Sequence, residues 1–254
     1  MPIGQADGMN KANQPYRGYR FPVEFIDHAV WLYLRLCLSF RDIEDLLAER
    51  GIVVSYETIR SWCIKFGPAY ARIIKKRRGS LGDTWYMDEV YIVTVRGERR
   101  YLWRAADQES LPHERSECFG YGDVLDILVQ KRKDKKAAER FFKKLMKGQG
   151  RSAREIVSDK LPSYGAARKA VMPTSMHCHE RYANNRAEVS HEHTRAQERH
   201  MRKFKSPGQT HRFLAVHSQV HNLFRVGRYL YQAVNYRLLR NRSFGTRQEV
   251  TRTD

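Results

Sequence analysis

The chain has 254 residues and a formal net charge of +19 at pH 7, with a sequence pI of about 10.0. Such an excess of Lys and Arg predicts a polyanionic partner, because binding to DNA or RNA releases counterions from the phosphates. No stretch approaches the roughly 18 consecutive apolar residues of a membrane span, and the polar first twenty residues lack the apolar core of a secretory signal. The four cysteines form no Cys-x-x-Cys pair, so we expect free thiols in a reducing cytoplasm.

Residues 1–20 predict a flexible basic arm, and residues 21–78 predict three short helices. Pro22 suits the first turn of one helix, while Ser39 and Ser55 can cap the next two. We expect the third helix to run from Tyr56 to about Phe66 and to stop at Gly67-Pro68. Three helices with a tight glycine-containing turn before the last one indicate a helix-turn-helix DNA-binding domain. Many bundles of three helices bind nothing, so that alternative stays open.

The expected DNA-binding residues of this unit lie on its third helix and just after it. The third helix is the expected reading helix and offers Tyr56, Arg60 and Lys65 to DNA. The run Lys75-Lys76-Arg77-Arg78 is expected to be a basic linker that also contacts DNA.

Residues 80–206 change to a pattern of strands and helices. The strands are expected at 84–95, 99–106, 123–130, 154–158 and 175–179, and the helices at about 135–148, 163–171 and 184–204. This order is typical of an RNase H-like fold, an α/β fold with a mixed five-stranded sheet flanked by helices. Residues 207–254 predict a basic C-terminal helical segment. Its apolar residues from Phe213 to Phe224 are expected to form a covering helix, and Tyr229–Arg242 a basic amphipathic stretch that contacts the DNA backbone or a partner subunit.

Three carboxylates stand out in that order. Asp88 interrupts an apolar strand, where an unpaired charge would cost several kcal/mol, so it should meet a metal, a cation or a hydrogen-bonding partner. Asp159 follows the fourth strand, and Glu188 lies in the first turn of the expected long helix. Two hard cations such as Mg²⁺, for which Mn²⁺ can substitute, bind such oxygen ligands and support phosphodiester cleavage. A purely structural role for Asp88 is the alternative.

Several other motifs show a resemblance to a known family. They are Trp85-Tyr86-Met87-Asp88-Glu89, Tyr101-Leu102-Trp103-Arg104-Ala105, Asp126-Ile127-Leu128-Val129-Gln130, Ser158-Asp159-Lys160, Ser163-Tyr164-Gly165, Tyr182-Ala183-Asn184-Asn185-Arg186-Ala187-Glu188 and Arg202-Lys203-Phe204-Lys205-Ser206. In this order they resemble the DDE transposases of bacterial insertion sequences, specifically the insertion-sequence-six family, over nearly the whole chain. The sequence departs from the family by about a dozen extra residues near 109–121.

The resemblance implies that Asp88, Asp159 and Glu188 form a catalytic triad that binds two Mg²⁺ ions. It also implies that Arg195 holds a DNA phosphate. We expect Arg199, Arg202 and Lys203, which follow on the same segment, to bind DNA as well.

Glu89 and the histidine motifs near these carboxylates are not expected to bind a metal. Strand alternation points Glu89 away from Asp88, so Glu89 is left out of the metal ligands. The spacings in His177-Cys178-His179 and His191-Glu192-His193 match no familiar zinc pattern, and we expect these histidines, with His200, to line the DNA-facing side near the site.

We therefore expect a bacterial DNA transposase that binds terminal inverted repeats and catalyses Mg²⁺-dependent 3′-end cleavage and strand transfer. Its expected substrate is double-stranded DNA, and we expect it to act as a homodimer. We expect no membrane partner, and a cytoplasmic location in association with the nucleoid. The alternative is a catalytically inactive, transposase-derived DNA-binding protein that represses its own ends.

Overall fold

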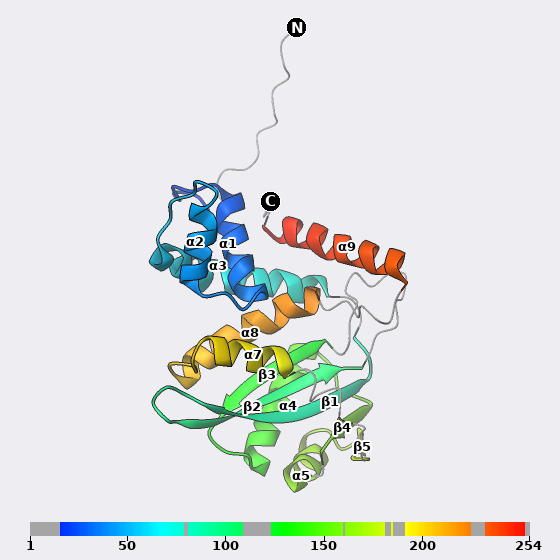
Figure 1. Ribbon diagram of the computed structural model, residues 1–254. Helices are drawn as coiled ribbons and strands as arrows, with labels where there is room; N and C mark the ends of the chain where they lie inside the picture. Colours follow the sequence, from blue (N-terminus) through cyan, green and yellow to red (C-terminus); the bar gives the residue numbers. More distant parts are fainter. Residues whose placement is uncertain are drawn as a thin grey trace.

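The computed structural model describes residues 16–78, 81–108, 123–159, 161–180, 184, 191–224 and 232–251. The extra residues near 109–121, most of the N-terminal arm and Glu188 lie outside this part of the chain. Three N-terminal helices form one unit, and a five-stranded sheet with helices on both faces forms another (Figure 1). The expected fold class, a mixed sheet flanked by helices and preceded by helices, is confirmed.

The N-terminal unit contains the three expected helices, α1 (Val23–Arg35), α2 (Phe40–Ala48) and α3 (Tyr56–Arg77). Ser39 caps α2 in a capping box with Asp42, and Ser55 accepts a hydrogen bond from the Thr58 N–H at the start of α3. Between α2 and α3, Gly51 has φ +75°, a left-handed conformation that glycine adopts without strain. The local sequence therefore fixes where α2 and α3 begin.

The expectation that α3 stops at Gly67-Pro68 is wrong, because the helix continues through Pro68 to Arg77. Pro68 removes a backbone hydrogen bond at a cost of about 3 kcal/mol. The continuation buries Tyr70, Ala71 and Ile74 in the core of the unit, which offsets that cost. Gly67 permits the close approach of α3 to α8 (Pro207–Leu223), since an added Cβ would lie 3.3 Å from Val216 Cγ1.

The sheet has the strand order β3-β2-β1-β4-β5, which is the RNase H-like order. Its strands are β1 (Thr84–Val93), β2 (Arg99–Asp107), β3 (Val124–Gln130), β4 (Glu155–Ser158) and β5 (Met176–Cys178). β1, β2 and β3 pair in antiparallel fashion, whereas β4 pairs in parallel with both β1 and β5. The central strand β1 therefore has an antiparallel neighbour on one side and a parallel neighbour on the other.

Helices cover both faces of the sheet. They are α4 (Lys135–Gln149) and α5 (Pro162–Val171) on one face, and α7 (Glu192–His200) and α8 (Pro207–Leu223) on the other (Figure 1). α4 and α5 pack on an apolar cluster around Trp85 and Trp103. α8 contributes Leu214 to the sheet side, and Val216, Val220 and Leu223 to the core of the N-terminal unit. α8 is thus buried between the two units.

The segment after α7 differs from the expected long helix. α7 ends at His200 rather than near Phe204, because Arg202 and Lys203 have φ of +50° and +75° and cannot continue a right-handed helix. Phe204 then pairs with Thr94 at the end of the β1–β2 hairpin and is fully buried. The expected start of the helix near Asn184-Asn185 falls mostly outside the described residues.

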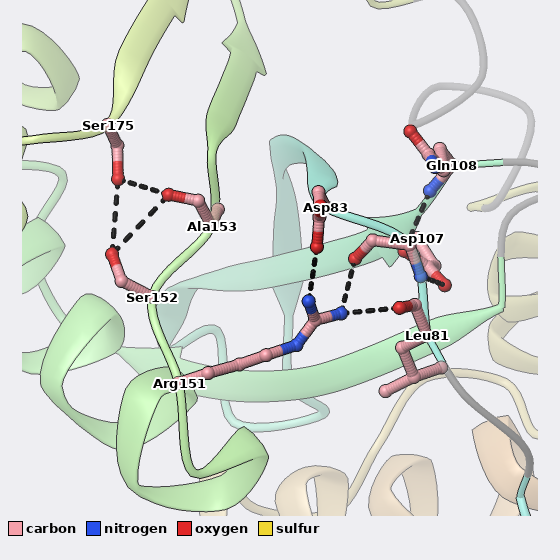
Figure 2. A network of polar contacts seen from close by, with 9 residues as sticks. Leu81, Asp83, Asp107, Gln108, Arg151, Ser152, Ala153 and Ser175 are labelled. Atoms are coloured by element: carbon pink, nitrogen blue, oxygen red, sulfur yellow. Dashed lines mark hydrogen bonds and ion pairs between the residues drawn. The ribbon is translucent and has the colours of Figure 1, made fainter.

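Arg151 ties together the segments that enter the sheet at the end opposite to the carboxyl ends of β1 and β4. Its guanidinium donates to the carboxylate of Asp83 and to the backbone carbonyl of Gly82 at 2.7 Å, just before β1 (Figure 2). Nearby, Ser175 Oγ donates to the Ala153 carbonyl at 2.5 Å, which joins the chain before β5 to the chain before β4. These contacts set the starting points of the parallel strands.

Among the described helices, none has the length and apolar character needed to cross a lipid bilayer.

The last helix, α9 (Ala233–Thr251), is held to the N-terminal unit by a buried ion pair. Arg247 Nη2 lies 2.5 Å from Asp27 Oδ2 of α1, and the Arg247 guanidinium stacks over Trp31 at 4.7 Å. Burial raises the pKa of Asp27 to about 6, against the opposing effect of Arg247. Loss of Arg247 would leave a buried carboxylate without its cation.

We expect Arg247→Met to lower the free energy of unfolding by about 3–5 kcal/mol at pH 8, because an unpaired buried charge remains. The pKa of Asp27 lies above its unfolded value, so the carboxyl takes up a proton near pH 5 and the loss shrinks there. Chemical denaturation at both pH values measures this. The matched control is Arg77→Met, which removes the exposed Arg77–Glu249 pair between α3 and α9 and should cost about 0–1 kcal/mol. Equal losses for the two variants at both pH values would contradict this account.

Candidate active site between β1 and the carboxyl end of β4

Strand register brings two of the three predicted carboxylates together. Met87 of β1 pairs with Ser158 of β4 in the parallel ladder, and Asp88 and Asp159 occupy the next position on each chain. Adjacent strands lie about 4.8 Å apart. Residues 71 positions apart in the sequence are therefore adjacent where β4 ends beside the middle of β1.

Asp88 is held in a mostly buried environment. Its side chain is 15% exposed, and its Oδ1 accepts a hydrogen bond from the Glu89 N–H at 2.8 Å. Burial raises the pKa of Asp88, while the Glu89 N–H and the charges of Lys133 and Arg104 oppose that rise. A buried acid of this kind favours either a proton or a bound cation.

His191 lies directly against Asp88. Its Nε2 is 3.2 Å from Asp88 Oδ2, yet neither ring nitrogen has a hydrogen-bond partner among the described residues. Burial, reinforced by Arg104 and Arg195, lowers the pKa of His191 to about 2. The ring is therefore neutral, and the contact with Asp88 is not an ion pair. This histidine is at the site, as expected, whereas His200 lies 3.6 Å from Asp42 of α2.

Arg104 links Asp88 to α7. It faces Asp88 across the β1–β2 ladder, and its side chain is 3% exposed. Its Nη2 donates to Thr194 Oγ1 on α7. A buried arginine beside Asp88 thus anchors the helix that follows the Glu188 segment.

Asp159, by contrast, is exposed to solvent at the mouth of the site. Its Oδ1 accepts a hydrogen bond from the Leu161 N–H at 3.2 Å, two residues further along the chain. Next to it, Ser158 Oγ is 2.8 Å from His177 Nε2 of β5, so His177 also lies near the site.

Glu188, the third predicted carboxylate, lies outside the described residues. The described residues on either side of it are informative. Asn184, which is 8% exposed, donates from Nδ2 to the carbonyl of Met87 at 2.8 Å. His191 contacts Asp88. Asn184 and His191, which precede and follow Glu188 in the sequence, therefore both contact β1, at Met87 and Asp88.

The donor set suits a hard divalent cation. Asp88 and Asp159 supply carboxylate oxygens, which Mg²⁺ and Mn²⁺ prefer as ligands. The described residues contain no cluster of three or more His, Cys, Asp or Glu side chains placed to hold a metal. Asp88 and Asp159 are thus the described part of a candidate metal site.

A second buried carboxylate occupies the opposite face of β1. Glu89, whose side chain is 1% exposed, pairs with Lys133 and accepts a hydrogen bond from the Tyr164 hydroxyl at 2.5 Å. Burial raises the pKa of Glu89, and the Lys133 and Tyr164 contacts oppose that rise. Strand alternation correctly separated Glu89 from Asp88, but the sequence analysis missed Lys133. Its only sequence signal was a basic residue just after β3, a place common to many solvated lysines.

The expected DNA-binding residues of α3 lie in two places. At its start, the Tyr56 ring stacks with Arg41, Arg60 pairs with Glu57 at 3.2 Å, and the Lys65 ammonium lies 4.6 Å from the Tyr19 ring. Arg60 and Lys65 are exposed. These three residues therefore share the first three turns of one helix and stay accessible.

The run 75–78 is not the linker expected from the sequence, since Lys75, Lys76 and Arg77 form the last turn of α3. Arg77 pairs with Glu249 of α9 at 2.5 Å. Arg78 Nη1 donates to the carbonyl of Val124 in β3 at 3.1 Å. At least two of these cations therefore make contacts that join parts of the protein.

The basic residues after the site lie on and beyond α7. Arg195 pairs with Glu198 at 3.0 Å and is 42% exposed. Arg199, Arg202 and Lys203 are exposed at the end of α7 and in the turn that follows. These side chains are free of the sheet and accessible to a large ligand.

Comparisons with known proteins agree with this architecture. A family described as a DDE domain matches residues 82–227, which span the sheet, α7 and α8. The transposase for insertion sequence-like element IS431mec of Staphylococcus aureus is 33% identical over 183 residues, covering 70% of this chain and 75% of that protein. The transposase for insertion sequence element IS257 in transposon Tn4003 of Staphylococcus aureus has the same identity and coverage.

Among solved structures, the catalytic domain of Mos1 mariner transposase is 15% identical with a TM-score of 0.39, covering 75% of this chain and 95% of that one.

We predict that Mg²⁺ or Mn²⁺ raises the thermal unfolding midpoint, and that the rise is larger at pH 8 than at pH 5.5. The pKa of Asp88 is raised by burial, so a cation must displace a proton from it at low pH. At a metal concentration one hundred times Kd the stabilisation is about 2.7 kcal/mol. Asp88→Asn should abolish the rise, whereas Asp45→Asn, which changes an exposed aspartate of α2, should keep it. A rise that survives in Asp88→Asn would remove Asp88 from the metal ligands.

Proposed function

Since this chain belongs to the DDE transposases of bacterial insertion sequences, of the insertion-sequence-six family, and is therefore a polynucleotidyl transferase, we propose how it acts on DNA. It binds the terminal inverted repeats of its element, cleaves the 3′ ends and transfers them to target DNA in a Mg²⁺-dependent reaction. The substrate is double-stranded DNA, both as element ends and as target.

The observation that carries the proposal is the convergence on β1. Asp88 and Asp159 meet through the parallel register, and Asn184 and His191, on either side of Glu188, both contact β1 beside Asp88. This arrangement supports Asp88, Asp159 and Glu188 as catalytic residues and metal ligands. Two Mg²⁺ ions, for which Mn²⁺ can substitute, would supply Lewis-acid activation of the attacking oxygen and charge stabilisation at the leaving oxygen.

The protein's own residues bind and align the reacting strands. The carboxylates of Asp88 and Asp159 would hold the cations, which would bind the scissile phosphate. In the first step a water attacks the phosphodiester and the 3′-hydroxyl leaves. In the second step that 3′-hydroxyl attacks a target phosphodiester, and a new 3′-hydroxyl leaves in the target strand. Each step breaks one P–O bond and forms one, so no covalent protein–DNA intermediate is needed.

Basic residues outside the carboxylate site hold the DNA. Arg195, Arg199, Arg202 and Lys203 bind phosphates next to the site. Tyr56, Arg60 and Lys65 bind the element end through the start of α3, with Lys75, Lys76, Arg77 and Arg78 adding positive charge. The exposure of Arg60, Lys65, Arg199, Arg202 and Lys203 supports this division.

Joining two element ends to one target requires two active sites, so the protein acts as a homodimer. Its place of action is the bacterial cytoplasm, in association with the nucleoid.

We expect Asp88→Asn, Asp159→Asn and Glu188→Gln each to lower end cleavage and strand transfer by about a thousandfold or more, since several kcal/mol of charge stabilisation are lost. Binding to labelled end DNA should change little, because the DNA-binding cations remain. Gel assays with and without Mg²⁺ measure both. Asp45→Asn, at an exposed position of α2, is the matched control and should retain activity.

The same assay separates the enzyme from an inactive, transposase-derived repressor. If the wild-type chain binds end DNA and forms no joined product with Mg²⁺ or Mn²⁺, the protein is better explained as an inactive repressor. Near-normal strand transfer by any one of the three variants would remove that residue from the triad.

We predict that Arg60→Met and Lys65→Met weaken binding to end DNA. Loss of a contact to a base weakens the binding free energy by about 1–3 kcal/mol and relaxes the sequence preference. Loss of a contact to a phosphate instead weakens binding to all sequences and lowers the salt slope of log K by about 1. Titrations of end DNA and scrambled DNA at several salt concentrations distinguish the two. Arg72→Met, on the exposed face of the second half of α3, is the control. Unchanged affinity in both test variants would exclude this face of α3 as the reading surface.

A further inference from the structure

Glu89 and Lys133 form a charge pair that the reaction described above does not use. The Glu89 side chain is 1% exposed, and its two oxygens contact the Lys133 ammonium and the Tyr164 hydroxyl. Tyr164 is a fully buried residue of α5. A carboxylate taken out of water is tolerated only with such partners. The pair therefore fixes the Lys133 ammonium at one position.

That position is beside the proposed catalytic site. Lys133 belongs to the connection between β3 and α4, and it reaches across β2 to Glu89 on β1. The charges of Asp159 and Asp88, as well as Glu89, act on the Lys133 ammonium. The Lys133 side chain is still 32% exposed. One lysine is thus anchored by a buried acid yet open to a ligand at the mouth of the site.

Further cations lie close to Lys133 along the chain. A surface hollow beside the end of β3 and the start of α4 is lined by Lys131, Arg132, Lys136, Arg140 and Lys144, with Asp134 as the acidic member; Lys133 is not among its lining residues. Asp134 is already used as the N-cap of α4, where it accepts from the Ala137 N–H at 2.8 Å. The hollow therefore adds a positive surface formed by the neighbours of Lys133 in the sequence, and such a surface suits a chain of phosphates.

We propose that Lys133 is a further DNA-contacting residue of the reaction, and that its ammonium binds a phosphate of the strand that enters the site at Asp88 and Asp159. Glu89 and Tyr164 are positioning residues for it. The inference rests on the proposed function, because the strand is the transposase's DNA substrate. A lysine binds phosphate as a point charge, and fixing it in advance reduces the entropy lost on contact.

A simple truncation of Lys133 would leave Glu89 buried without its cation and could unfold the protein. We therefore use the double variant Glu89→Gln/Lys133→Met, in which both charges are removed and the Gln carbonyl still accepts from Tyr164. Lys133→Arg keeps the charge. Lys169→Met, which removes one exposed cation at the end of α5, is the control for the loss of a lysine elsewhere on the surface. Thermal unfolding confirms that the double variant is folded.

The test measures strand transfer with end DNA in which single phosphates near the joined end are replaced by neutral methylphosphonates. We expect the double variant to lose about ten- to a hundredfold in strand transfer, as when one charged hydrogen bond is lost. One methylphosphonate should slow the wild type and Lys169→Met by a similar factor, yet leave the double variant unaffected. Lys133→Arg should respond as the wild type does.

If the folded double variant transfers strands as fast as Lys169→Met, or slows equally at every methylphosphonate, Lys133 is a structural partner of Glu89 only and the inference is wrong. A failure of the proposed function looks different, because the wild type then joins no DNA with Mg²⁺ or Mn²⁺. In that case the affinity for end DNA, measured at several salt concentrations, tests the role of Lys133. The salt slope of log K for the double variant should be smaller than that for Lys169→Met by about 0.9, and equal slopes overturn the inference.

Discussion

The parallel pairing of β1 with β4 is the constraint on which the rest of the site depends. A shift of one residue in the ladder would move every side chain of one strand to the other face, and Asp159 would no longer meet Asp88. The register is held from the opposite end, where Arg151 binds the chain just before β1 and Ser175 binds the chain just before β4. Contacts far from the carboxylates thus determine whether the carboxylates meet.

The two faces of β1 handle buried negative charge in different ways. On one face Asp88 lies between a neutral His191 and the buried Arg104, and its pKa is raised by burial, which leaves it ready to exchange a proton for a cation. On the other face Glu89 has a permanent partner in Lys133. Adjacent residues of one strand therefore serve different purposes. One acid remains available to a ligand, whereas the other organises the protein around it.

Most of the fold could be predicted from the sequence, because local signals and long-range pattern agree. Alternating apolar runs gave the strands, and Ser39, Ser55 and Asp134 marked helix starts that the structure confirms. The prediction failed where tertiary packing overrides a local signal. Pro68 should end a helix, yet the apolar residues after it are needed by the core shared with α8, and that need is invisible locally.

The candidate site was predicted in part for the same reason. Asp88 was conspicuous because a charge in an apolar strand demands an explanation, and Asp159 followed from its place after β4. Lys133 was not predictable, because nothing in the local sequence distinguishes it from Lys131 on the same connection or from Lys135 at the start of α4. Its importance comes only from the distance to Glu89 in the folded chain. His191 and Asn184 likewise gain meaning only from their contacts with β1.

α8 packs against both the sheet and the N-terminal helices, and this limits which parts can be exchanged between related proteins. The N-terminal helices look like a detachable module, but Val216, Val220 and Leu223 of α8 complete their core from the far end of the chain. A chimera that exchanges only residues 21–78 would confront the new helices with a foreign apolar surface. Changing end recognition by module exchange therefore requires that the matching face of α8 be exchanged too, so the two parts are expected to evolve as a unit.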